Sequence, residues 1–191
     1  IHVEAGERVY RRNNVPEEYN RVMTDHAAYL CLTCTTRARD YLLREGMCPE
    51  RVKFVGDTMY DLFKWAMYNK KYLTKLNYNS IGLKKGGYHL ATIHRAENTT
   101  DKKHAISLLS ALDKSSKPTV LPLHPRLGKL LKSWKPSNNL RLINPLGYFE
   151  FLNFLLNCDK CVTDSGGVTR EAFFAKSIVL LPDNRKTFGY L

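Results

Sequence analysis

Strand-like and helix-like segments alternate along almost the whole chain, and this alternation constrains the fold more than any other feature. Short apolar runs that favour strands are separated by stretches in which apolar residues have helical spacing. The strand candidates are residues 1–3, 29–33, 51–55, 88–92, 119–122, 140–143, 160–163 and 178–181. Alternating β and α segments are typical of parallel sheets with helices on both faces. The sequence therefore predicts an α/β fold of Rossmann-like type.

Local signals mark the ends of several helices. Pro16 suits the first position of a helix, and Glu17 and Glu18 place negative charge at the positive end of its dipole. Thr35 can cap a second helix, which we expect to stop at Gly46. The other helix candidates are residues 58–69, 101–112, 125–131, 148–157 and 168–175.

Residues 70–87 interrupt the alternation, because they are rich in Lys, Asn and Gly and have little apolar periodicity. We interpret this stretch as a linker. Residues 1–78 would then form the C-terminal part of one Rossmann-like domain, and residues 79–191 a second, incomplete at its end. Ligands of such sheets bind beyond the carboxyl ends of the strands, so we expect a cleft there, between the domains.

The charge balance bears on the choice of partner. The 191 residues contain 30 Lys and Arg against 18 Asp and Glu, a formal charge of +12. This surplus favours anionic partners, but no nucleic-acid-binding signature accompanies it, so we interpret it as a solvated surface. No apolar run approaches the ~20 residues of a membrane span. The start of the chain does not resemble a signal peptide, and we expect a cytoplasmic protein without a membrane partner.

Four of the five cysteines form two CxxC pairs, Cys31 with Cys34 and Cys158 with Cys161. This spacing occurs in zinc sites. Zinc knuckles lie on turns, however, whereas these pairs lie in segments that favour strands. We therefore interpret the cysteines as buried and reduced, and predict no metal site.

The strongest local motif is Thr163-Asp164-Ser165-Gly166-Gly167, which follows a strand and opens a helix. Two glycines allow backbone N–H groups to approach a phosphate, and the helix dipole favours negative charge there. The Gly-Lys-Ser/Thr ending of a Walker loop is absent. Glu171 lies one helical turn further on, where it is either a ligand of ribose hydroxyls or a solvated acid.

A second motif places His94 and Arg95 directly after the strand at residues 88–92. A histidine and an arginine at a strand end suit a diphosphate. His124 has the same placement after the next strand. Phe151 is either an aromatic platform for a base or a core residue.

Carboxylates form the third group. Glu4 ends the first strand, and Glu17 and Glu18 begin the following helix. Carboxylates at a strand end in a cleft are candidates for acid–base chemistry when their pKa values are pushed apart. Acids at the start of a helix often serve only its dipole, so we expect Glu18 to be structural.

In order and spacing, these segments resemble the non-hydrolysing UDP-N-acetylglucosamine 2-epimerases. The matching segments are residues 2–6, 16–25, 56–61, 92–98, 124–125, 145–151 and 163–172. They span nearly the whole chain, and the ordered set is far more specific than any single motif. The resemblance implies a GT-B-like fold of two Rossmann-like domains and a homodimer that needs neither a metal nor NAD.

The resemblance also implies an activity, the inversion of C2 in UDP-N-acetylglucosamine by elimination and re-addition of UDP. Glu4 and Glu17 match carboxylates of the acid–base chemistry, His94 a residue at the diphosphate, and Arg21 an arginine of the cleft. The matches to UDP contacts are Leu146 (through its backbone), Phe151, Ser165, Gly166, Gly167 and Glu171. The matches to a second, activating UDP-N-acetylglucosamine site of bacterial members are Arg95, Glu97 and His124.

The chain also departs from the family pattern. It lacks the Gly-x-Arg-Pro-Glu loop and the His-Gly-Asp segment, so we expect this chain alone to be inactive. Cys34 replaces a usual Pro and Asp57 a usual Asn, and the segment around Arg185 matches poorly a motif that binds substrate. Two alternatives therefore stay open: the same chemistry on another UDP-2-acetamido sugar, such as a diacetamido uronic acid, or a non-catalytic nucleotide-sugar-binding protein.

Overall fold

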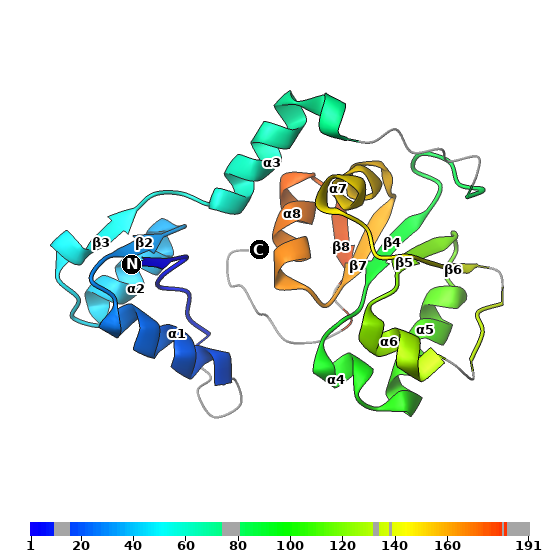
Figure 1. Cartoon of the computed structure of the whole chain (residues 1–191), viewed down its shortest axis with the longest axis horizontal. Coiled ribbons are helices and arrows are strands. Elements are labelled where there is room, and N and C mark those ends of the chain that lie inside the picture. The colour runs from blue at the N-terminus through cyan, green and yellow to red at the C-terminus, as the bar shows by residue number, and fades with distance from the viewer. Residues whose placement is uncertain (10–15, 74–80, 132–133, 138, 181, 183–191) are drawn as a thin grey trace. The chain divides into compact units, whose positions relative to one another are not determined.

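The protein is an α/β structure with two parallel sheets, as the alternation predicts (Figure 1). The computed structural model describes residues 1–9, 16–73, 81–131, 134–137, 139–180 and 182, and of residues 126, 129 and 130 only the backbone. By its contacts, the described chain divides into two compact units, residues 1–64 and residues 65–182. No described helix has both the length and the apolar character needed to cross a membrane.

The first unit contains a three-stranded parallel sheet in the order β1–β2–β3. Its elements are β1 (His2–Val3), α1 (Pro16–Ala27), β2 (Cys31–Thr33), α2 (Thr36–Arg44), η2 (Pro49–Arg51), β3 (Val52–Phe54) and the first part of α3 (Thr58–Tyr68). The buried apolar core of this unit consists of Ala5, Ala28, Cys31, Leu42, Met47 and Val52.

The expected helix signals are present in this unit. The Thr35 hydroxyl accepts a hydrogen bond from the backbone N–H of Ala38 at 3.0 Å, which caps α2. Gly46 follows the helix with a φ of 85°, a conformation that glycine adopts without steric penalty. Gly6, after β1, has a φ of 82° and packs closely against the backbone of Ala38.

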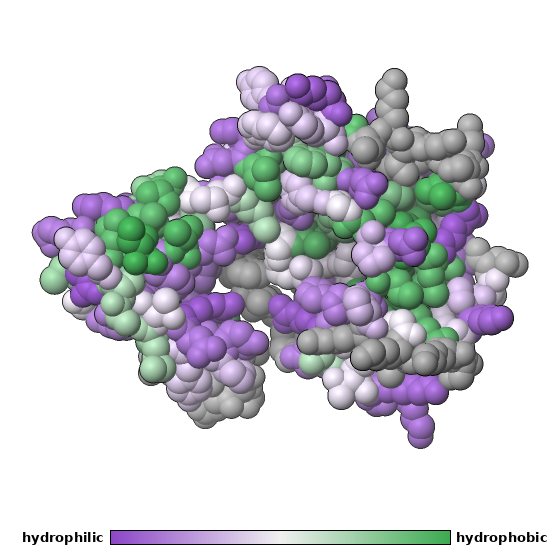
Figure 2. All heavy atoms as spheres, in the orientation of Figure 1, coloured by the Kyte–Doolittle hydropathy of each residue, from purple (hydrophilic) through white to green (hydrophobic). Residues whose placement is uncertain are grey.

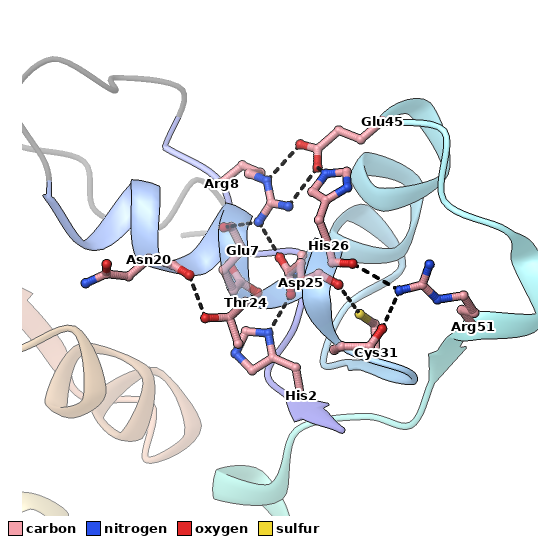
Figure 3. Close-up of polar contacts among 12 residues, drawn as sticks. His2, Glu7, Arg8, Asn20, Thr24, Asp25, His26, Cys31, Glu45 and Arg51 are labelled. Carbon is pink, nitrogen blue, oxygen red and sulfur yellow. Dashed lines mark hydrogen bonds and ion pairs between the residues drawn. The ribbon is translucent and has the colours of Figure 1, made fainter.

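A buried ion-pair network joins the loop after β1 to α1 and α2 (Figure 3). The Arg8 guanidinium donates to both carboxylate oxygens of Glu45 at 2.7 Å and to Asp25 at 2.6 Å. Asp25 also accepts from the backbone N–H of Gly6 and contacts the His2 ring. Because one buried guanidinium contacts two carboxylates, its charge is compensated.

Apolar side chains gather over the strands of the first unit (Figure 2). Four large apolar residues in or next to β1 and β3 are exposed, namely Ile1, Val3, Phe54 and Val55. Parallel sheets are normally covered on both faces, so this surface is unusual for such a sheet.

The second unit contains a five-stranded parallel sheet in the order β6–β5–β4–β7–β8. Its strands are β4 (His89–Thr92), β5 (Thr119–Pro122), β6 (Leu140–Ile143), β7 (Lys160–Thr163) and β8 (Ile178–Leu180). Its helices are α4 (Ala96–Thr99), α5 (Lys102–Asp113), α6 (Pro125–Leu130), α7 (Tyr148–Asn157) and α8 (Gly166–Phe174). These strands lie where the sequence predicts them, whereas the short helix α4 was not predicted.

Helices cover both faces of this sheet (Figure 1). The chain runs outward from β4 through α5 and α6, then returns to the other side of β4 through α7 and α8. Right-handed crossovers then place α5 and α6 on one face and α7 and α8 on the other. A buried cluster under α5 and α6 includes Ala105, Leu109, Leu121 and Leu127.

Parts of the expected linker, together with Trp65 near the end of α3, pack within the second unit. Trp65 and Tyr72, the latter in η3 (Lys70–Tyr72), lie with ring centroids 6.1 and 5.7 Å from that of Phe149 in α7. The backbone N–H of Gly86 donates to the carbonyl of Asn157 at 2.8 Å. Residues 74–80 lie outside the described ranges, so the domain boundary expected at residues 78 and 79 stays a prediction.

Candidate active site

The candidate site of the second unit lies where the strand order of its sheet reverses. β4 and β7 are neighbours, yet the chain leaves β4 toward one edge of the sheet and β7 toward the other. The register pairs Thr92 with Thr163, the last residue of each strand, and their hydroxyls lie 2.5 Å apart. The loops after the two strands therefore diverge from a common point, which is the usual ligand crevice of open α/β sheets.

Asp164 connects these two loops. Its buried carboxylate accepts hydrogen bonds from the backbone N–H groups of His94 at 3.1 Å and Arg95 at 2.9 Å, and from the Asn98 amide at 3.0 Å. The His94 ring contributes a further contact, with Nδ1 2.9 Å from the carboxylate. The sequence analysis did not single out Asp164, although its position between a strand and a glycine-rich helix start was a signal.

The Ser165 loop forms the start of α8, as predicted. The Ser165 hydroxyl accepts from the backbone N–H of Val168 at 3.3 Å and so caps the helix. Gly166 and Gly167 are the first two helical residues. Backbone N–H groups in the first turn have no acceptor within their own helix and lie at the positive end of its dipole. The loop can therefore bind an anion such as a phosphate.

A pocket of about 220 Å³ opens beside this point. Its lining residues are Thr92, Ile93, His94, Pro122, Leu123, His124, Pro125, Pro145, Leu146 and Phe151. It brings together four residues that the sequence singled out, and the rings of His94 and His124 lie with centroids 6.1 Å apart. Phe151 lines the pocket, which suits a stacking partner for a flat ring better than a core residue.

Glu171 is a buried carboxyl in α8, not the solvated acid that was the alternative. Burial raises its pKa, while Tyr148 and Arg170 act in the opposite direction. Burial and the nearby Glu171 carboxylate together raise the pKa of Tyr148 to about 12. Tyr148, which the sequence analysis did not assign to the site, therefore lies close to Glu171.

Arg95 and Glu97 lie at the start of the short helix α4. Arg95 is the N-terminal cap residue and is half-buried, and Glu97 is exposed in the first turn. Their assignment to a second ligand site stays a prediction.

The remaining predicted residues belong to the first unit. Glu4 follows β1 and has a φ of 62°, a left-handed conformation that is uncommon outside glycine and often marks functional positions. Glu17 is exposed in the first turn of α1. Arg21 lies 3.6 Å from Glu18, whose buried side chain accepts from the backbone of Val9. Glu18 thus has the structural environment that we expected.

One group of described residues has the composition of a cation site. The donor atoms of Glu4, Cys34 and Asp57 all lie within 4.8 Å of one another. The four cysteines of the CxxC pairs are free thiols, three of them buried and Cys158 half-buried.

Comparison with known proteins identifies relatives. A family model described as UDP-N-acetylglucosamine 2-epimerase matches residues 1–186. UDP-N-acetylglucosamine 2-epimerase of Methanocaldococcus jannaschii is 35% identical over 196 residues, which cover 96% of this chain and 53% of the relative. The UDP-2,3-diacetamido-2,3-dideoxy-D-glucuronate 2-epimerase of Pseudomonas aeruginosa is 39% identical over 180 residues, which cover 91% of this chain and 48% of the relative. The chain thus spans about half the length of these relatives.

Comparison with solved structures identifies the same family. The crystal structure of the M. jannaschii epimerase in complex with UDP-GlcNAc and UDP has a TM-score of 0.78 at 34% identity, covering 94% of this chain and 52% of that one. The Neisseria meningitidis UDP-GlcNAc 2-epimerase bound to UDP-GlcNAc has a TM-score of 0.75 at 26% identity, covering 97% and 53%. Sequence, fold and strand-end site therefore lead to one conclusion: the chain belongs to the UDP-N-acetylglucosamine 2-epimerase family.

Proposed function

We propose that the full-length protein containing this chain converts UDP-N-acetylglucosamine to UDP-N-acetylmannosamine by inverting C2. The observation that carries the proposal is the meeting of His94 and the Ser165 loop at the reversal point of the sheet, beside the pocket that Phe151 lines. A diphosphate fits between an imidazole and a helix N-terminus. The base of the nucleotide then needs an aromatic face, which Phe151 supplies. The ribose needs a carboxyl, which Glu171 supplies.

The C2 proton of the sugar is not adjacent to a carbonyl, so its direct removal is very unfavourable. In the proposed reaction one carboxylate removes that proton while the C1–O bond breaks, giving 2-acetamidoglucal and UDP. UDP then adds back to C1, and C2 receives a proton on the opposite face. His94 and the N–H groups of the Ser165 loop stabilise the negative charge that gathers on the departing diphosphate.

Glu4 and Glu17 are our candidates for the two proton transfers, and Arg21 for a substrate contact. Which carboxylate acts as the base and which as the acid stays open. These residues belong to the first unit, so the proposal includes a GT-B-like arrangement in which the cleft lies between two Rossmann-like domains, with the boundary near residues 78 and 79. It also includes a homodimer in the cytoplasm that supplies precursors for surface polysaccharides.

A second substrate is favoured by one specific observation. The P. aeruginosa relative, which is named for a UDP-diacetamido glucuronate, is 39% identical to this chain. That identity exceeds the 35% of the M. jannaschii relative named for UDP-N-acetylglucosamine, so the same elimination chemistry on a diacetamido uronic acid is the alternative. Non-catalytic binding of a nucleotide sugar is the third.

The test uses the full-length protein in D₂O with each UDP-sugar in turn, and NMR at C2. Deuterium at C2 together with the C2-inverted product identifies the substrate and supports elimination. Glu4→Gln and Glu17→Gln are each expected to abolish inversion while leaving UDP binding intact, whereas Glu50→Gln, an exposed carboxylate on η2, is the control that keeps activity. A folded protein that binds UDP but exchanges neither sugar would instead support the binding protein.

A further inference from the structure

Three side chains with metal-binding atoms converge in the first unit, at the carboxyl ends of three neighbouring strands. Glu4 follows β1, Cys34 follows β2, and Asp57 lies just beyond β3. Their ligand atoms all lie within 4.8 Å of one another. We propose that Glu4, Cys34 and Asp57 form a zinc-binding site.

The sheet and the start of α3 hold the donors in place. The backbone N–H of Val55 donates to the carbonyl of Thr33 at 3.0 Å, which keeps the ends of β2 and β3 side by side. One carboxylate oxygen of Asp57 accepts from the backbone N–H of Met59 at 2.8 Å. That bond orients the carboxylate at the start of α3.

The donor set favours a cation of intermediate softness. Two carboxylates so close together repel each other when both are ionised, and a cation between them relieves the repulsion. Magnesium and calcium prefer oxygen ligands only, whereas zinc also binds thiolate sulfur. With zinc bonds of about 2.0–2.3 Å, a tetrahedral ion holds its ligand atoms about 3.5 Å apart. Binding therefore requires side-chain rotations that bring the present separations, all within 4.8 Å, to that value.

Burial and ligand number then indicate the type of site. Cys34 is only 7% exposed, whereas Glu4 and Asp57 are half-buried, so an ion can enter from the carboxylate side. Three protein ligands leave the fourth position of a tetrahedral ion open, as in zinc sites that bind water or a ligand.

This site differs from the metal chemistry that the sequence analysis considered. The CxxC spacing pairs Cys34 with Cys31, yet the Cys31 thiol donates to the backbone carbonyl of Asp25 at 3.3 Å. The partners of Cys34 come instead from two other strand ends. If the proposed function holds, an ion here withdraws the Glu4 carboxylate from proton transfer, and zinc inhibits the full-length enzyme.

The test uses the 191-residue chain, with Co²⁺ as the spectroscopic probe for zinc. We expect one equivalent of Co²⁺ to produce a thiolate-to-cobalt absorption band that Zn²⁺ displaces. Cys34→Ser should abolish the band and weaken zinc binding more than tenfold. The matched control is Cys48→Ser, which removes an exposed thiol and should keep both. Asp57→Asn should keep the band and weaken binding about tenfold or more, because it removes one charged ligand.

Circular dichroism establishes the fold of each variant. Should Cys34→Ser unfold, Asp57→Asn decides the question, because asparagine caps a helix as well as aspartate does. The proposal is overturned if the wild-type chain gives no thiolate band, if the band survives in folded Cys34→Ser, or if zinc affinity is unchanged in Asp57→Asn. These measurements need no epimerase activity, so a failure of the proposed function leaves them unaffected.

Discussion

The carboxylate of Asp164 accepts the backbone N–H of His94 through both of its oxygens, each at 3.1 Å, and also contacts the His94 ring at 2.9 Å. The two residues follow different strands and are far apart in the sequence. The contact therefore ties the loop that presents the imidazole to the loop that begins α8. Asp164 is in this sense a positioning residue for both halves of the candidate diphosphate site.

We expect Asp164→Asn to weaken both the fold of the second unit and its affinity for UDP. The amide provides one acceptor oxygen where the carboxylate provides two, and it turns an NH₂ group toward N–H donors. Leaving buried donors unsatisfied costs about 1–3 kcal/mol. UDP affinity should fall about tenfold, equivalent to about 1.4 kcal/mol.

Calorimetric titration with UDP and thermal unfolding measure the two effects of Asp164→Asn. The control is Asp159→Asn, which alters a partly exposed carboxylate that pairs with Lys117 away from the pocket. Equal UDP affinity for wild type and Asp164→Asn would remove Asp164 from the site.

We expect Glu171→Gln to change the pH dependence of stability and, separately, to weaken the binding of UDP. The folded protein raises the pKa of Glu171 through burial, so the folded state holds this proton more tightly than the unfolded state does. Stability is then lost as the pH rises above the ordinary value of 4.5, because the folded state must accommodate a buried charge. Glutamine does not titrate, so the variant does not lose stability in this way.

The melting temperature of Glu171→Gln should therefore decline less than that of the wild type as the pH rises above 4.5. Its affinity for UDP should drop, while its affinity for inorganic diphosphate, which has no ribose, should not change. A parallel pH dependence of both proteins, or an equal loss for diphosphate, contradicts this assignment.

Gly6→Ala should prevent the first unit from folding. Gly6 has a φ of 82°, and a Cβ atom there would lie 2.3 Å from the carbonyl oxygen of Ala38, a backbone atom that cannot move aside. Gly46→Ala is a matched control, because Gly46 has a similar φ of 85° but open space around it. We expect the control to lose only about 1 kcal/mol, the penalty of a left-handed conformation. Circular dichroism and limited proteolysis compare them, and comparable stability of the two variants would refute the argument.

Glu45→Gln should change the acid stability of the first unit. The Arg8 hydrogen bonds lower the pKa of Glu45, against the opposing effect of burial. The resulting stabilisation is fully present above the ordinary value of 4.5 and is lost as the pH falls through the lowered pKa. The variant should be less stable at neutral pH and should lose less on acidification.

Urea unfolding at several pH values measures this difference, with Glu50→Gln, an exposed carboxylate, as the control. A wild-type pH profile that coincides with that of Glu45→Gln would show that the ion pair with Arg8 contributes nothing.

Much of the fold is readable in the sequence because it depends on local rules. Apolar runs and helical spacing predicted the strands and the main helices, and the cap at Thr35 lies where residue type predicted it. Helix α8 begins at Gly166, two residues before the expected start, and Ser165 caps it. The strand-end positions of His94 and His124 followed from the same reading. The short helix α4 was not predicted, because four residues carry too little periodicity to be recognised.

What only the tertiary structure decided is which strand ends meet. Sequence order does not say that β4 lies beside β7, and that neighbourhood brings Asp164 to His94. The contact of Tyr148 with Glu171 and the convergence of Glu4, Cys34 and Asp57 arise in the same way. Strand order is set by long-range packing of apolar faces, to which residues distant in the chain contribute together. The sequence by itself therefore determined the α/β class and the strand-end residues, and the packed sheets decided which of them act together.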